Sequence, residues 1–254
     1  MEWIDEGIIL SAQPHGETSV IVTLLTAEHG RHAGLVCGGQ SGRHQATLMV
    51  GNQVKARWRA RLIDHLGTFS LEVLAPTAAP WLCDPEILAL IASATTVTEA
   101  SLPERQPMPA LYDALLALFS LEDRTLWGPA YISWEIGVLK ALGYGLDLSH
   151  CALTGACEGL AYISPRTGRA VTAEAAVPYK DRLLPMPAFL CGAANWDEND
   201  ILKGLDLTGH FLSQNVFAHP QNRRLIPMDG DLPYARQRLV EYYQNRLNTT
   251  ARVA

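Results

Sequence analysis

The sequence lacks the short motifs that mark common hydrolases and nucleotide-binding enzymes. It has no H-E-x-x-H, no G-x-S-x-G and no Gly-Lys-Ser/Thr that would complete a phosphate-binding loop. A small acidic cluster, Asp197, Glu198 and Asp200, has the composition of a solvated helix start. We therefore expect a protein without enzymatic turnover.

Long apolar runs are also missing, and so is a basic leader. No segment approaches the ~20 apolar residues of a membrane span, and the start MEWIDEGIIL is acidic. The cysteines are odd in number and widely spread, which disfavours a disulfide framework. They are Cys37, Cys83, Cys151, Cys157 and Cys191. We expect a cytoplasmic protein, associated with the nucleoid if it binds DNA, with no membrane contact.

A structural zinc site would need more ligands than the sequence offers. Cys151 and Cys157 have five residues between them, whereas structural zinc takes four ligands, usually as two close pairs. His150 and Cys191 stand at no familiar spacing from them. Cys151 and Cys157 are weak metal candidates, and we expect no zinc and no other cofactor.

Charge is scarce and unevenly distributed. Asp, Glu, Lys and Arg make up 18% of the chain, and the net charge is −6. Between Arg31 and Ile63 there is no Asp or Glu, while six Lys and Arg residues give +6, which leaves −12 for the remainder. These cations are Arg31, Arg43, Lys55, Arg57, Arg59 and Arg61. A basic patch on an acidic body is typical of a nucleic-acid-binding surface.

Four of the cations alternate with apolar residues in VKARWRARLI, Val54 to Ile63. Successive side chains of a β-strand point to opposite faces, so this period predicts a strand with one apolar and one cationic face. Trp58 falls on the apolar face and is expected in the core, and Phe69 is ambiguous. The cationic face is either solvated or meets an anionic ligand.

The first 80 residues have the pattern of a small β-barrel. Short apolar or β-branched runs alternate with polar turns, and five such strands in about 75 residues favour a five-stranded OB-fold. The expected strands are 7–12, 19–26, 31–37, 54–63 and 68–74.

The remainder, residues 81–254, reads as a helical domain after the connection APTAAPWLCDP. Asp84 is a candidate N-cap, with Pro85 at the first helical position. The fold class is therefore α+β. The expected helices are 85–94, 110–120, 129–142, 200–205 and 234–247. An irregular insertion lies at about 147–187.

Several long segments resemble the RecO family of bacterial recombination mediators. GIILSAQPHGETSVIVTLLTAEHGRHAGLVCGG resembles the start of that family, and YISWEIGVLKALGYGLDLSHCALTG resembles its strongest signature. YISPRTGRAV, PAFL, LTGHFL and PYARQRLVEYY are similar to its α-proteobacterial members. The similarity covers nearly the whole chain.

The resemblance implies an N-terminal OB-fold, a helical domain and a zinc-finger-like insertion. It implies binding to single- and double-stranded DNA, strand annealing, and action with RecR to help RecA load on DNA coated by single-strand-binding protein (SSB). Some members hold zinc with four cysteines. Here only Cys151 matches, and Thr154 or Gly155 stands where its partner is expected, so we expect a degenerate, metal-free insertion.

Our hypothesis is that the six cations, Arg31, Arg43, Lys55, Arg57, Arg59 and Arg61, form a DNA-binding track. RecR and the SSB C-terminal tail are the expected protein partners, with RecA indirect. The alternative is a protein-interaction adaptor whose basic strand binds an acidic partner rather than DNA. A third hypothesis is an RNA-binding translation factor that uses Gly38-Gly39-Gln40, and it rests on only these three residues.

Overall fold

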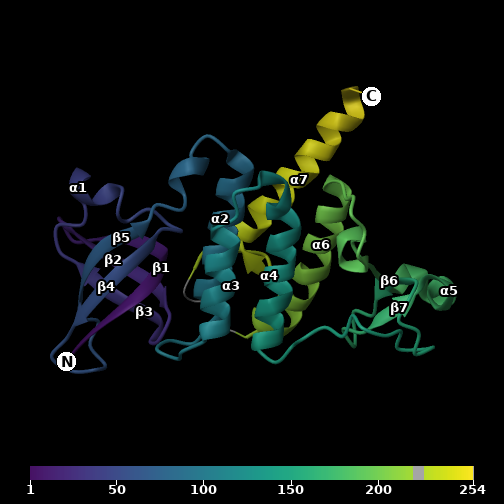
Figure 1. Cartoon of the computed structure of the whole chain (residues 1–254), viewed down its shortest axis with the longest axis horizontal. Coiled ribbons are helices and arrows are strands. Elements are labelled where there is room, and N and C mark those ends of the chain that lie inside the picture. The colour runs from purple at the N-terminus through teal and green to yellow at the C-terminus, as the bar shows by residue number, and fades with distance from the viewer. Residues whose placement is uncertain (220–225, 254) are drawn as a thin grey trace.

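A barrel, a group of helices and a small sheet follow one another along the long axis of the molecule (Figure 1). The computed structural model describes residues 1–219 and 226–253, except for the side chains of Arg43 and of residues 250–253. The architecture is mixed α+β, with a five-stranded sheet at the N-terminus followed by helices.

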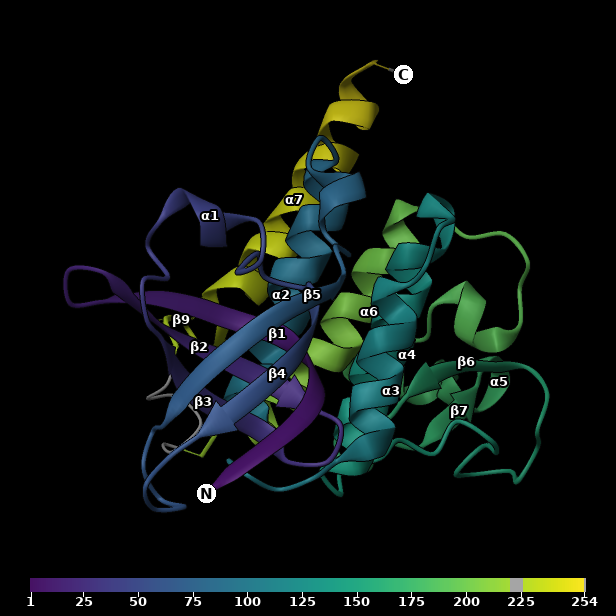
Figure 2. The same ribbon diagram turned by 60° about the vertical axis from the view of Figure 1, so that its left-hand side comes forward.

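The N-terminal sheet closes into a barrel in the order β1-β2-β3-β5-β4. Its pairs are antiparallel except for β3 with β5, which is parallel. A short helix, α1 (Gly42–Gln45), which the sequence did not predict, lies in the connection from β3 to β4. The strands are β1 (Glu2–His15), β2 (Ser19–Thr26), β3 (Gly30–Val36), β4 (Gln53–Arg59) and β5 (Thr68–Ala75). Figure 2 turns the barrel toward the viewer, with β4 and β5 in front of the helices.

Alternating apolar residues fill the barrel. Ile9, Val22, Leu24 and Val54 are fully buried there, as the two-residue period of each strand requires. Packing inside the barrel requires glycine at position 34, because a Cβ there would lie 2.5 Å from the Phe69 ring.

The described residues of the second part of the chain include five long helices. They are α2 (Pro85–Ser101), α3 (Pro109–Phe119), α4 (Trp127–Ala141), α6 (Glu198–Phe211) and α7 (Tyr234–Val253). The predicted cap at Asp84 is confirmed, since its side chain accepts from the backbone N–H groups of Glu86 and Ile87. A π-helical turn, Leu212–Val216, continues α6.

The barrel and the helices share one hydrophobic core. Ile8 and Leu25 of the barrel belong to the same buried cluster as Ile87 and Leu90 of α2. At the edge of this contact the Ser11 hydroxyl donates to the Glu99 carboxylate of α2 at 2.8 Å. The barrel is therefore mounted on α2 by its β1 and β2 side, which leaves β4 and β5 on the opposite side (Figures 1 and 2).

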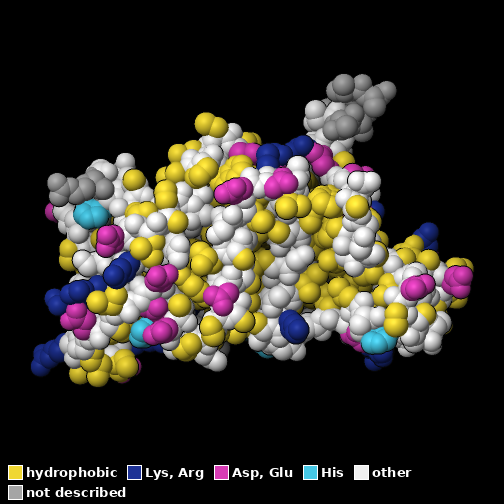
Figure 3. All heavy atoms as spheres, viewed as in Figure 1, with side chains coloured by type: hydrophobic (Ala, Val, Ile, Leu, Met, Phe, Trp, Pro, Cys, Tyr) yellow, Lys and Arg dark blue, Asp and Glu magenta, His cyan; other side chains and the backbone are white. Residues whose placement is uncertain are grey.

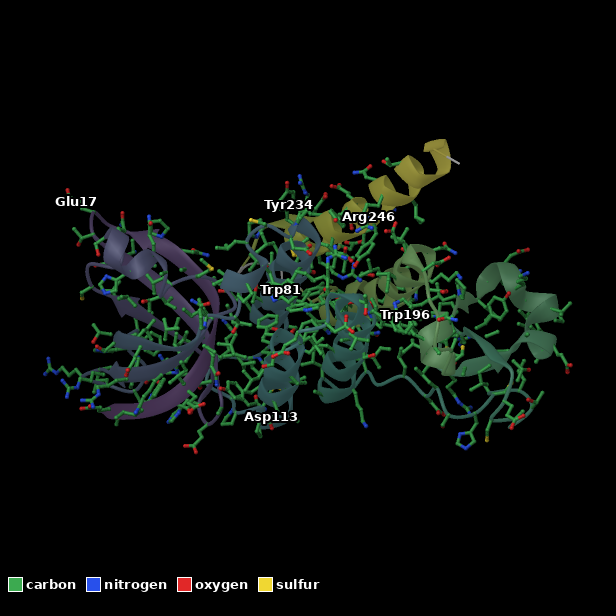
Figure 4. All side chains as sticks on the ribbon, turned by 45° about the horizontal axis from the view of Figure 1, so that its top comes forward. Glu17, Trp81, Asp113, Trp196, Tyr234 and Arg246 are labelled. Carbon is green, nitrogen blue, oxygen red and sulfur yellow. The ribbon has the colours of Figure 1, made fainter. Side chains whose placement is uncertain are left out.

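Charged groups tie α7 to the start of α2. Arg246 and Arg124 both bond the Glu86 carboxylate, at 2.8 and 2.6 Å, and the Tyr243 hydroxyl donates to it at 2.7 Å. Figure 4 shows Arg246 reaching from α7 toward the helices beneath it. Because three donors converge on one carboxylate, α7 is held at its middle rather than only at its apolar face.

The insertion contains regular structure that the sequence did not predict. Strands β6 (Leu160–Ile163), β7 (Ala170–Thr172) and β8 (Leu184–Pro185) form a small sheet in the order β7-β6-β8. Helix α5 (Ala173–Ala176) follows β7. A separate two-residue pair, β9 (Met228–Asp229) with β10 (Leu232–Pro233), precedes α7. Among residues 1–219 and 226–253, no helix is both long and apolar enough to cross a bilayer.

Candidate nucleic-acid interface

Strand β4 separates its side chains as the alternation predicts. Val54, Ala56 and Trp58 are 0%, 0% and 1% exposed, whereas Lys55, Arg57 and Arg59 are all exposed. Lysine and arginine side chains gather at this end of the molecule in Figure 3, on the far left of the barrel. Three cations therefore stand in a row on the outer surface, away from the helices.

The neighbouring strands add carboxylates to this row, so the face is not purely cationic. Glu2 and Glu6 of β1 lie opposite Arg59 and Lys55, and Glu72 of β5 lies opposite Lys55 on the other side. Directly opposed residues point to the same face. Glu2 forms ion pairs with Arg57 at 3.3 Å and with Arg59 at 2.8 Å. The hydrogen bond from Arg59 lowers the pKa of Glu2.

Two shallow grooves run beside the cations. One, of about 550 Å³, lies between the end of β3, α1, β4 and β5, and the other, of about 260 Å³, lies over β1, β4 and β5. Arg57, Ser70 and Leu71 line both grooves. His44 and Arg59 line the larger one, and Lys55 the smaller. The grooves share three lining residues and so adjoin each other along β4, where Lys55, Arg57 and Arg59 line them together with Glu72.

Arg61 does not belong to the strand, because β4 ends at Arg59. It is exposed in the β4–β5 loop, next to the end of the cationic row. The side chain of Arg43 lies outside the described part of the chain, although its backbone belongs to α1.

The structure places the Arg31 side chain in the interior. Its side chain is buried, its Nε donates to the Leu102 carbonyl at 2.8 Å, and its Nη1 lies 3.5 Å from the Glu104 carboxylate. Arg31 therefore joins β3 to the segment after α2. The expectation that it extends the DNA track is not supported, because a buried guanidinium with these partners is not available to a phosphate.

Aromatic side chains gather inside the barrel rather than on its cationic face. Trp3 stacks on His29 at 4.2 Å and on Trp58 at 5.7 Å. His32 and Phe69 pack edge-on against Trp3. Trp58 and Phe69 are both buried, and Trp58 donates its indole N–H to the Leu66 carbonyl at 2.9 Å. These two residues are core, so base stacking on them is not available at this surface.

The two cysteines of the insertion, Cys151 and Cys157, lie in different surroundings. Cys151 is buried beside Thr172, whose backbone N–H donates to its sulfur at 3.4 Å, whereas Cys157 is exposed. Across the described ranges, no group of three or more His, Cys, Asp or Glu side chains is placed to hold a metal ion. The Thr172 hydroxyl also lies 3.8 Å from the Cys151 sulfur.

A fully buried ion pair lies among the helices. Arg236 of α7 and Glu135 of α4 are fully buried and form a bidentate pair with distances of 2.6 and 3.0 Å. The Tyr131 hydroxyl donates to Glu135, and Arg236 also donates to the Leu205 carbonyl. Burial lowers the pKa of Arg236, and the Glu135 charge more than reverses this, so its pKa stays raised. The pair fixes the packing of α4, α6 and α7 and has no access to ligand.

Comparison with known proteins matches both parts of the chain to one family. Residues 1–76 match the model described as recombination protein O N terminal, and residues 83–224 match recombination protein O C terminal. The DNA repair protein RecO of Rhodospirillum centenum is 49% identical over 252 residues, covering 98% of each chain. The RecO of Rhodospirillum rubrum is 49% identical over 249 residues, covering 95% of this chain and 96% of the relative. That of Dinoroseobacter shibae is 46% identical over 224 residues, covering 88% and 92%.

Proposed function

The chain belongs to the RecO family of DNA repair proteins, and from this premise we propose that it binds single-stranded DNA along the outer face of β4. The proposed contacts are Lys55, Arg57, Arg59 and Arg61. The observation that carries the proposal is the exposed row of cations on a grooved barrel surface opposite the helices. The five-stranded closed order β1-β2-β3-β5-β4 supports assignment of the barrel as an OB-fold.

Contacts of this kind suit a mediator. Lysine and arginine that neutralise phosphates give affinity and position a strand, but they do not read its sequence. Two complementary strands held on such a surface repel each other less, because the cations screen their phosphates. We propose that annealing follows from this screening, and that the protein acts on DNA without catalytic turnover.

The acidic remainder of the chain is better suited to proteins than to DNA. We propose that the helical domain engages RecR and the C-terminal tail of SSB, and that it assists RecA loading on SSB-coated DNA. The site of action would be the cytoplasm, at the nucleoid. We propose that this scheme needs no cofactor, and the packing of Val171 and Ala176 against Cys151 supports a metal-free insertion.

The direct test compares two variants that remove the same charge. In the first, Lys55, Arg57, Arg59 and Arg61 are all changed to Ser. In the control, four exposed cations of the helical domain and insertion are changed to Ser, namely Lys140, Arg166, Lys180 and Arg182. Fluorescence anisotropy with a labelled strand of about 40 nucleotides measures binding.

Both variants have a net charge four units lower, so a nonspecific charge effect would weaken them equally. The proposal predicts that the barrel variant loses binding and the control keeps most of it. Equal behaviour of the two would remove β4 as the DNA site. If the barrel variant instead keeps DNA binding but loses an acidic protein partner, the adaptor function takes its place.

A further inference from the structure

Three aliphatic side chains are exposed to solvent at the end of the barrel, in the loop between β4 and β5. Leu62, Ile63 and Leu66 are 55%, 57% and 40% exposed. We call these three residues the loop patch. Figure 3 shows hydrophobic side chains gathered at this lower left end of the molecule, beside lysine and arginine side chains. Exposed apolar side chains that are grouped at one place on a surface are typical of binding sites.

The loop is held in place rather than free. Arg105, from the segment between α2 and α3, donates to the carbonyls of Ile63 and His65. Trp58 donates to the Leu66 carbonyl at 2.9 Å. Gly67 closes the loop at a φ of +66°, where a Cβ would lie 2.4 Å from the Trp58 indole nitrogen. The barrel and the helical part thus fix the backbone, and the side chains of Leu62 and Ile63 are presented outward.

The surroundings of the loop patch indicate what covers it. Arg59 ends β4, and Arg61 stands between it and Leu62, so the patch continues the cationic row. The acidic residue of the loop, Asp64, faces Arg105 at 3.8 Å. A partner that reaches the patch from β4 must therefore combine regularly spaced negative charge with flat apolar surface. A single nucleic-acid strand has both, in its phosphates and in the faces of its bases.

We infer that Leu62 and Ile63 contact the bases of the same strand whose phosphates lie on Lys55, Arg57, Arg59 and Arg61. This inference rests on the proposed DNA binding. It divides the affinity into two parts. The cations supply a part that falls with salt, and the loop patch supplies a part that depends on the presence of bases and is insensitive to salt.

The test uses two strands with the same phosphates. One is an oligothymidine, and the other has the same length but carries abasic sugars throughout. The variant is Leu62→Ser with Ile63→Ser in the full chain. Arg105 bonds to backbone carbonyls of the loop, so these side-chain changes leave its anchoring in place. The matched control is Leu153→Ser with Val177→Ser, two residues of the insertion that are 62% and 74% exposed.

Wild type should bind the oligothymidine about tenfold more tightly than the abasic strand, since a contact worth roughly 1.4 kcal/mol corresponds to a factor of ten. The Leu62/Ile63 variant should bind both strands almost equally, with an unchanged salt slope, and the control should keep the wild-type ratio. The inference is wrong if the variant keeps that ratio, or if wild type binds both strands equally. Binding of neither strand would contradict the proposed DNA binding itself, and this inference with it.

Discussion

Glu2 lies opposite Arg59 in the β1–β4 pair, and its carboxylate is 2.8 Å from the Arg59 Nε. The same carboxylate is 3.3 Å from Arg57. Glu2 thus forms ion pairs with two of the three exposed cations of β4. A phosphate that binds these arginines must compete with Glu2, so this residue weakens DNA binding by an amount that can be measured.

Glu2→Gln should therefore strengthen binding to single-stranded DNA, by roughly two- to fivefold at low salt, because an exposed charge pair is worth little in water and is screened by ions. Anisotropy titration at about 50 mM salt measures the change. The control is Glu17→Gln at the β1–β2 turn, which removes the same charge at the barrel tip labelled in Figure 4. Equal gains in the two variants would mean that net charge, and not the Glu2–Arg59 pair, sets the affinity.

The buried Arg236–Glu135 pair predicts a large loss of stability on breaking it. Arg236→Met should lower the free energy of unfolding by about 3–5 kcal/mol, since Glu135 would remain buried without its partner. Denaturant unfolding measures the change. Arg238→Met, on the same helix but with a side chain 63% exposed, should change it by less than about 0.5 kcal/mol.

Removing both members of the pair should recover much of that loss. In Arg236→Met with Glu135→Leu, no uncompensated charge is left in the core. If the double variant is as unstable as Arg236→Met alone, the other bonds of Arg236, such as that to the Leu205 carbonyl, carry the stability.

We expect the free energy of unfolding to depend on pH through His32. The ring is buried among Trp3, Trp58 and Phe69, and within the described residues neither of its nitrogens has a hydrogen-bond partner. Burial lowers its pKa from 6.5 to about 4, and the nearby charge of Arg105 adds to the effect. The unfolded chain therefore takes up a proton near pH 6.5, before the folded chain does.

Protonation of His32 favours unfolding over this interval. Its contribution to the free energy of unfolding is full above pH 6.5 and falls as the pH drops toward 4, by up to about 3 kcal/mol. His32→Phe should flatten this part of the curve of unfolding free energy against pH. His15→Phe, at the exposed end of β1, should leave it unchanged. A His32→Phe curve with the wild-type slope would show that other groups control the acid response.

The insertion should fold without metal. Purified protein is expected to contain far less than one equivalent of zinc by elemental analysis, and a chelator should leave its melting temperature unchanged. Structural zinc contributes folding free energy directly, so a true site would reveal itself by a lower melting temperature after chelation. Stoichiometric zinc together with that shift would contradict the metal-free insertion.

Local pattern predicted much of the fold. The alternation in Val54 to Arg59 and the β-branched run of β2 define their strands, because both carry the two-residue period of a sheet with one buried face. Helix α2 was predicted to end at Ala94, yet it continues to Ser101. Its last part, with Thr95, Thr96 and Thr98, has weak intrinsic preference for a helix. Burial of Val97 and Ala100 in the shared core overrides that preference.

The candidate site was only partly predictable, because its missing features come from neighbours in space. Nothing within β4 indicates that Glu2 and Glu72 flank its cations, since the register between strands is set by the closed barrel. Arg31 looked like a surface cation by residue type, and only the tertiary structure shows its bond to Leu102. The apolar run after Arg61 was visible, but its exposure depends on where β4 ends.

The most direct test of the account is the salt dependence of wild-type binding to a single strand. About four phosphate contacts predict a slope of log K against log salt near −2.8, which means roughly 50-fold weaker binding when salt rises from about 50 to about 200 mM. The variant with Lys55, Arg57, Arg59 and Arg61 changed to Ser should show a much shallower slope. A wild-type slope near zero, or the same slope in both proteins, would contradict a DNA track along β4.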